Sequence, residues 1–110
     1  MTIREYLTPQ GRSPFRDWLR TLDLPLRARI QARVLRFELG NFGNSKSVGD
    51  GVWEGRIMFG PGYRIYFGKQ GHSVVLLLLG GTKDKQIQDI ARAKSYWREY
   101  RGAVNHGKTQ

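Results

Sequence analysis

Alternating apolar and polar positions mark two strands in the middle of the chain. Residues 52–59 and residues 63–67 both follow a period of two, so that every second side chain lies on the same face. The glycine-rich segment 60–62 between them is typical of a reversing turn. The pattern predicts a hairpin that, if its register permits, gathers four polar side chains on one face of an otherwise apolar sheet: Glu54, Arg56, Arg64 and Tyr66.

A short strand and a short helix are predicted before this hairpin. Residues 3–7 alternate between apolar and polar side chains and are followed by a segment of loop composition. Ser13 followed by Pro14 is typical of a helix N-terminus, and apolar residues recur at helical spacing as far as Leu22. The sequence therefore predicts a strand and then an amphipathic helix.

A second helix is predicted over residues 25–39. Asp23 or Leu24 caps its start, and Gly40 is its C-terminal cap. The helix carries two apolar stripes on nearly opposite sides, so it needs the sheet as one partner and the first helix, or another protein, as the second. Three arginines lie between the stripes and form a solvated face, or an RNA groove if the fold turns them toward the hairpin: Arg29, Arg33 and Arg36.

The remaining segments alternate between loop and regular patterns. Residues 41–51 are rich in Gly, Asn and Ser and are predicted to form a surface loop, from which Lys46 could touch a phosphate. Residues 74–79 are continuously apolar, which predicts a strand buried on both faces at the centre of the sheet. A last helix is predicted over residues 84–101, followed by a polar, frayed tail at residues 102–110.

These elements predict a single α+β domain spanning residues 1–110, in the order β-α-α-β-β-β-α. A chain of this length can bury a core without disulfides. We expect an antiparallel sheet with the helical pair packed on one face, and polar residues on the other face.

The composition adds a strong positive charge to this picture. Lysine and arginine total 19 against 9 acidic residues, which gives a formal net charge of +10. Both halves of the chain are positive, so the excess belongs to the folded body and not to a detachable tail. A basic domain of this size usually binds nucleic acid, or an acidic protein that covers the same surface.

Several kinds of site and compartment are excluded by the composition. No cysteine is present, and the two histidines, His72 and His106, lie far apart, so we expect no disulfide, no metal and no other cofactor. The longest apolar run, residues 74–79, is too short to cross a bilayer, and the N-terminus has no signal-peptide pattern. We expect a soluble protein of the cytoplasm with no membrane partner.

The cationic side chains near the hairpin suit the recognition or cleavage of a phosphodiester. Arg56 and Arg64 can neutralise the charge that gathers on the phosphate in the transition state. Lys83 directly follows the buried strand, at a helix N-terminus where anions bind. Glu54 could orient Arg56 or act as a base, and Tyr66 could stack on a nucleobase. From the residues alone, binding and catalysis both remain open.

Two separated motifs resemble the RelE/ParE superfamily of type II toxin–antitoxin toxins, in its HigB-like branch of addiction-module killer proteins. The motifs are GVWEGRIMFGPGYRIYFG and LLLLGGTKDKQIQDIARAKSYW, and the resemblance covers about residues 6–97. It implies a RelE-like fold and a ribosome-dependent endoribonuclease, or mRNA interferase, that cuts translated mRNA by metal-free attack of a ribose 2′-hydroxyl. It also implies a small antitoxin partner, commonly with a helix-turn-helix domain, which neutralises the toxin and binds the operator DNA.

The resemblance also implies roles for individual residues. Arg64 would bind and stabilise the scissile phosphate, and Lys83 would be the cation at the leaving group. Glu54 and Arg56 occupy strand positions that often carry basic residues, so the acidic Glu54 leaves the general base open. Asp89 is a candidate for that base, or else it orders the last helix. The candidates for contacts to the substrate are Tyr66, Lys46, Lys85 and Asp89.

Two alternative functions are weighed against this one. A ParE-like protein of the same fold would poison DNA gyrase instead of cutting RNA, but such relatives usually lack the full cationic cluster, so Arg64 and Lys83 argue against it. A non-enzymatic module would only bind nucleic acid or an antitoxin. Its binding to RNA would depend steeply on salt.

Overall fold

One mixed sheet of five strands, in the order β1-β5-β4-β3-β2, forms the centre of the α+β fold. The computed structural model describes the backbone of residues 1–108 and the side chains of residues 1–104. Neighbouring strands are antiparallel, except that β1 runs parallel to β5. The strands are β1 (Thr2–Glu5), β2 (Ser45–Gly49), β3 (Val52–Ile57), β4 (Tyr63–Gln70) and β5 (Val74–Thr82).

Three α-helices and one short 3₁₀ helix accompany the sheet within the described residues. Ser13 caps α1 by accepting a hydrogen bond from the backbone N–H of Arg16 at 3.0 Å, and Asp23 caps α2 by accepting one from Leu26 at 3.1 Å. Gly40, with φ of +82°, ends α2 as predicted. The helices are α1 (Pro14–Arg20), α2 (Leu24–Glu38), η1 (Lys83–Lys85) and α3 (Gln86–Lys108).

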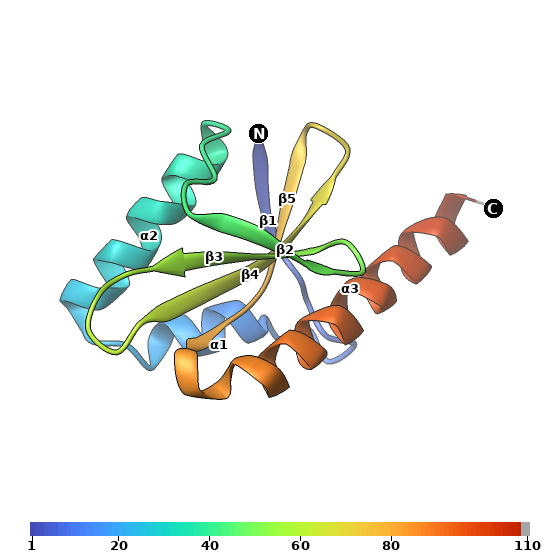
Figure 1. Ribbon diagram of the computed structural model, residues 1–110. Helices are drawn as coiled ribbons and strands as arrows, with labels where there is room; N and C mark the ends of the chain where they lie inside the picture. The colour runs from blue at the N-terminus through green and yellow to red at the C-terminus, as the bar shows by residue number, and fades with distance from the viewer. Residues whose placement is uncertain (109–110) are drawn as a thin grey trace.

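Two apolar cores lie on opposite faces of the sheet. On one face α1 and α2 pack their buried side chains, such as Phe15 and Ile30, against the strands. On the other face Ala93 and Trp97 of α3 pack against Tyr66 and its neighbours. Figure 1 shows α2 and α3 on opposite sides of the sheet. This second face carries the polar residues of the hairpin, as expected, but α3 also covers much of it with apolar side chains, which the sequence did not predict.

The sheet differs from the sequence prediction in three respects. β2 lies inside the segment 41–51 that was predicted to be a loop, because its sequence SKSVG lacks the apolar alternation that reveals a half-buried strand. The sheet is not purely antiparallel, since β1 pairs in parallel with β5. The middle strand is β4, although β5 is buried on both faces as predicted.

The C-terminal helix is longer than predicted. α3 continues to Lys108, beyond the predicted end at residue 101. The last part of the predicted tail, residues 109–110, lies outside the described residues. No helix in the described part of the chain is long and apolar enough to cross a membrane.

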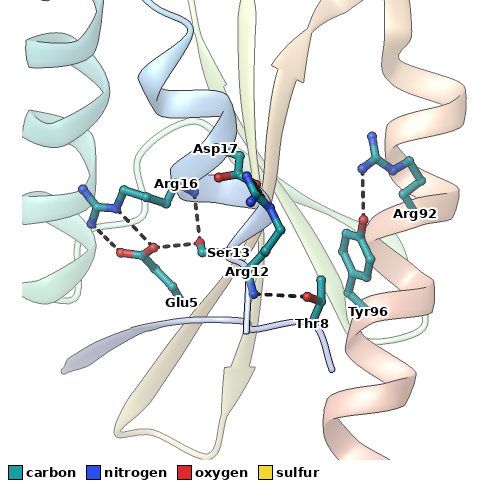
Figure 2. A network of polar contacts seen from close by, with 8 residues as sticks. All are labelled: Glu5, Thr8, Arg12, Ser13, Arg16, Asp17, Arg92 and Tyr96. Atoms are coloured by element: carbon teal, nitrogen blue, oxygen red, sulfur yellow. Dashed lines mark hydrogen bonds and ion pairs between the residues drawn. The ribbon is translucent and has the colours of Figure 1, made fainter. Parts of the chain in front are cut away.

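A polar network fixes the start of α1 to the end of β1 (Figure 2). The Ser13 hydroxyl donates to Glu5 Oε1 at 2.7 Å while it also caps the helix. The Arg16 guanidinium donates to both carboxylate oxygens of Glu5. The hydrogen bond from Arg16 holds the pKa of Glu5 below its ordinary value, against the opposing effect of burial. One carboxylate therefore joins a strand, a helix cap and a cation.

Glu5→Gln is expected to lower the free energy of unfolding by about 1 kcal/mol at pH 7, a small value because Arg16 is partly solvated. The folded-state pKa of Glu5 is depressed, so its stabilisation is present above the ordinary pKa of 4.5 and is lost as the pH falls through the lower, folded value. Urea unfolding from pH 7 downward should thus show the variant and the wild type converging below pH 4.5. Glu38→Gln, at an exposed carboxylate on α2, is the control. A difference in the free energy of unfolding between the variant and the wild type that stays constant with pH would contradict the prediction.

Candidate active site

The register of β2, β3 and β4 brings most of the predicted site residues onto one face of the sheet. Glu54 lies opposite Tyr66 on β4 and opposite Lys46 on β2. Arg56 lies opposite Arg64 in the adjacent row. Residues directly opposite in an antiparallel pair share a face. The predicted meeting of the four hairpin residues is therefore confirmed, and Lys46 joins them from a strand that the sequence did not reveal.

Glu54 is the centre of this cluster. Its side chain is 0% exposed, and its carboxylate has three partners: Arg56 Nε at 3.3 Å, Arg64 Nε at 3.5 Å and Gln86 Nε2 at 2.8 Å. A buried carboxylate is tolerated only with such partners. Because Glu54 does not reach the surface, the geometry favours the first of its two proposed roles. It orients the two arginines, and it is not positioned to take a proton from a substrate.

Arg64 and Lys83 both lie close to Gly62 in the turn between β3 and β4. A β-carbon placed on Gly62 would lie 3.7 Å from Arg64 Nη1 and 3.8 Å from Lys83 Cβ. The Lys83 backbone N–H donates to the Gly62 carbonyl at 3.3 Å. Arg64 is 8% exposed, whereas Lys83 is exposed at the start of η1. The turn therefore brings a buried cation that is paired with Glu54 and an exposed cation into one neighbourhood.

Tyr66 is fully buried, and its hydroxyl has no hydrogen-bond partner among the described residues. Burial raises the pKa of this hydroxyl, and the negative charges of Glu54 and Asp89 raise it further. The expected stacking of the Tyr66 ring on a nucleobase is not possible in this arrangement. The ring instead packs under α3 in the apolar core that contains Trp97, so its role is to pack the strand that carries Arg64.

Asp89, in the first turn of α3, sits directly over Gly81, where any β-carbon would overlap its carboxylate. Gly81 is the partner of Arg64 in the sheet, and Arg64 is the partner of Arg56, so Asp89 lies at the end of the arginine row formed by Arg56 and Arg64. Its side chain is 4% exposed, and burial raises its pKa while Arg92 and Lys85 oppose the rise. A carboxylate with a raised pKa is suited to proton transfer, but its main contact here is with the sheet.

Lys85 is not brought to the arginine row. It is exposed and lines a cleft of about 650 Å³ between α1 and α3. Five residues drawn in Figure 2 line this cleft: Thr8, Arg12 and Asp17 on the α1 side, and Arg92 and Tyr96 on α3. Asp89 reaches the same cleft. The predicted contact of Lys85 with a substrate would therefore need a ligand that extends past α3.

One contribution to the site, from Gln86, was missed by the sequence analysis, and one, from Arg33, was left open there. Gln86 hydrogen-bonds Glu54, and its only signal was its place within the second motif, three residues after Lys83. Arg33 donates from Nη1 to the backbone carbonyl of Arg56 at 2.7 Å, so the fold does turn this part of α2 toward the hairpin. Among the residues that the structure describes, no three His, Cys, Asp or Glu side chains are grouped so that they could hold a metal ion.

Comparison with known proteins relates the chain to a protein of a bacterium. No family model matches it, and no solved structure matches it. A protein of Haemophilus influenzae, described only as an uncharacterized protein, is 48% identical over 81 residues, which cover 73% of this chain and 82% of the Haemophilus protein. Identity this high over most of both chains establishes common descent. The chain belongs to the same protein family as the Haemophilus influenzae protein.

Proposed function

We propose that this protein is the toxin of a type II toxin–antitoxin pair, with a RelE-like fold, and that it cleaves translated mRNA on the ribosome in the cytoplasm. The observation that supports the proposal most is the group of Arg56, Arg64 and Lys83 at the hairpin, which we call the cationic row. Glu54 pairs with both Arg56 and Arg64, and Lys83 lies next to Gly62, as Arg64 does. Preorganised cations of this kind stabilise a phosphate that gains charge in the transition state.

The chemistry is the attack of a ribose 2′-oxygen on the adjacent phosphorus. The bond to the 5′-oxygen of the next nucleotide breaks, so that a 2′,3′-cyclic phosphate and a 5′-hydroxyl result. The proton of the 2′-hydroxyl leaves to a base, and the departing 5′-oxygen takes up a proton. In this scheme Arg64 and Arg56 balance the phosphate charge, and Lys83 supplies positive charge at the departing oxygen. Glu54 is a positioning residue, because it touches the arginines and not the RNA.

The partner in this proposal is an antitoxin that blocks the cationic row. A protein with net charge +10 has strong electrostatic attraction to RNA, so its neutralisation requires an acidic or well-fitting cover. An antitoxin with a helix-turn-helix domain would supply that cover and would carry the complex to operator DNA.

Controlled expression tests the proposal. Wild type, Arg64→Ala and Lys83→Ala are induced separately, growth is followed, and transcript ends are mapped by primer extension. The wild type is expected to stop growth and to cut within translated codons. Either substitution should reduce cutting at least about 100-fold, as expected for the loss of one group that stabilises the transition state. Arg98→Ala, at an exposed arginine on α3, is the matched control and should cut normally.

Growth arrest with intact transcripts would overturn the nuclease proposal. A DNA-damage response under the same conditions would then favour the gyrase alternative. Thermal unfolding of each purified variant checks that loss of cutting is not loss of folding.

A further inference from the structure

A second basic surface lies on the other side of β3 from the cationic row, between α2 and the tip of the hairpin. It is a groove of about 310 Å³, and it has no acidic side chain in its lining. The charged residues that line it are four arginines: Arg29, Arg33, Arg36 and Arg56. None of the first three forms an ion pair within the described part of the chain. Arg56 is paired with Glu54, but the three arginines of α2 concentrate positive charge in the groove without a counter-ion among the described residues.

The charge in this groove is held in place and partly desolvated. The Arg33 side chain is half-buried and is fixed by its hydrogen bond to the Arg56 carbonyl. Burial lowers the pKa of Arg33, and the neighbouring Arg36 lowers it further. The half-buried Arg33 and the exposed Arg36 repel each other unless an anion lies between them. The groove is thus built in a form that an anionic ligand would stabilise.

Apolar side chains lie next to these arginines at the tip of the hairpin. The Arg29 guanidinium lies 4.0 Å from the centre of the Phe59 ring. Phe59 is 38% exposed, and its neighbour Met58 is 83% exposed. A flat ring beside a guanidinium is the kind of surface on which an unpaired nucleobase stacks. An acidic peptide would use the charges but would gain little from the ring.

The groove and the cationic row meet at Arg56. Its side chain binds Glu54 in the row, whereas its backbone carbonyl anchors Arg33 in the groove. The pairing of β2 with β3 ends at Ser45 and Gly55, and the last backbone contact beyond it is the Arg56 N–H, which donates to the Asn44 carbonyl. The segment after Arg56 is therefore not covered by β2. A strand of RNA could therefore pass around this open edge of β3 from the row into the groove.

We propose that the groove binds the part of the single-stranded RNA that adjoins the cleaved phosphate. Arg29, Arg33 and Arg36 bind its phosphates, and Phe59 stacks on one of its bases. The proposal rests on the proposed function for the identity of the ligand. It assigns to α2 a role in substrate binding that is separate from the chemistry on the sheet.

The test is equilibrium binding of a 2′-O-methyl oligoribonucleotide of about ten nucleotides, measured by fluorescence anisotropy at several salt concentrations. This probe has the shape and charge of RNA but cannot undergo 2′-hydroxyl attack, so binding is measured without cleavage. The variants are Arg29→Ala with Arg36→Ala as a pair, and Phe59→Ala alone. Arg4→Ala with Arg98→Ala removes the same charge at exposed sites on β1 and α3 and is the matched control.

The groove pair is expected to weaken binding at least about 10-fold and to reduce the slope of log affinity against log salt by about 1 to 1.5, the value for two lost phosphate contacts on a single strand. Phe59→Ala should weaken binding about 5- to 10-fold and leave the slope unchanged, because it removes stacking and no charge. Equal losses in the groove pair and the control pair would overturn the proposal.

Polyglutamate distinguishes RNA from an acidic protein as the ligand. If the groove pair loses affinity for polyglutamate as strongly as for the oligonucleotide, and Phe59→Ala affects neither, the groove is a general acidic-protein surface and the RNA proposal is overturned. The proposed nuclease function fails separately. Intact transcripts in induced cells, together with groove-dependent oligonucleotide binding, would overturn cleavage but support the groove.

Discussion

Glu54→Ala is expected to lower the free energy of unfolding by about 3–5 kcal/mol, the range for removing one partner of a buried ion pair. The substitution leaves the buried Arg64 guanidinium without its carboxylate and leaves Gln86 without its acceptor. It also opens a cavity at a position that is fully buried. Urea unfolding at pH 7, followed by circular dichroism, measures the change.

A double substitution separates the cost of an unpaired charge from the value of the pair. Glu54→Leu combined with Arg64→Met replaces both charges by apolar side chains of similar size and is expected to recover most of the lost stability. It should have no nuclease activity, because Arg64 is gone. If Glu54→Ala costs less than about 1 kcal/mol, the carboxylate does not hold the arginines as described here.

Gly68→Ala is expected to lower the free energy of unfolding by about 3 kcal/mol, at the upper end of the usual cost of overpacking. Gly68 lies on β4 beneath the ring of Trp97, and an added β-carbon would lie 2.7 Å from Cη2 and closer still to Cε3 and Cζ3. The ring cannot easily move, because Trp97 is buried and stacks on Tyr100. Thermal and urea unfolding should both show the loss.

Two further variants test whether overlap with the Trp97 ring causes the loss expected for Gly68→Ala. Gly102→Ala lies in α3 with no atom within 4 Å of the new β-carbon, and it is expected to stabilise the protein by about 0.5–1 kcal/mol through helix propensity. In the background of Trp97→Leu, adding Gly68→Ala should cost much less than it does alone. Additive losses in the double variant would show that the overlap with the ring is not the cause.

The hairpin could be predicted from the sequence because its information is local. Period-two alternation on each strand and the glycine-rich turn between them are enough to predict that Glu54, Arg56, Arg64 and Tyr66 share one face. The register that places Glu54 opposite Tyr66 and Arg56 opposite Arg64 comes from the structure. The caps at Ser13 and Asp23 are local in the same sense, since each bonds a backbone N–H three residues later.

The parts that could not be predicted depend on contacts between distant segments. Whether Tyr66 stacks on a ligand or packs under a helix depends on where α3 crosses the sheet, and no pattern near Tyr66 contains that information. The same holds for Gln86 and Arg33, which reach the hairpin from two helices. β2 was missed for a different reason. It is a polar edge strand, and its pairing to β3 is specified by the partner more than by its own sequence.

The parallel pairing of β1 with β5 affects how the chain folds during its own synthesis. Thr2 pairs with Val74 and Glu5 with Leu77, so the first strand to leave the exit tunnel must wait for the last strand of the sheet. Lys83 and Gln86 come later still, in η1 and at the start of α3. A chain that is released early therefore has neither a closed sheet nor the complete cationic row. Under the proposed function, a translation product that ends before α3 would be harmless, and only a chain that includes η1 and α3 would need an antitoxin.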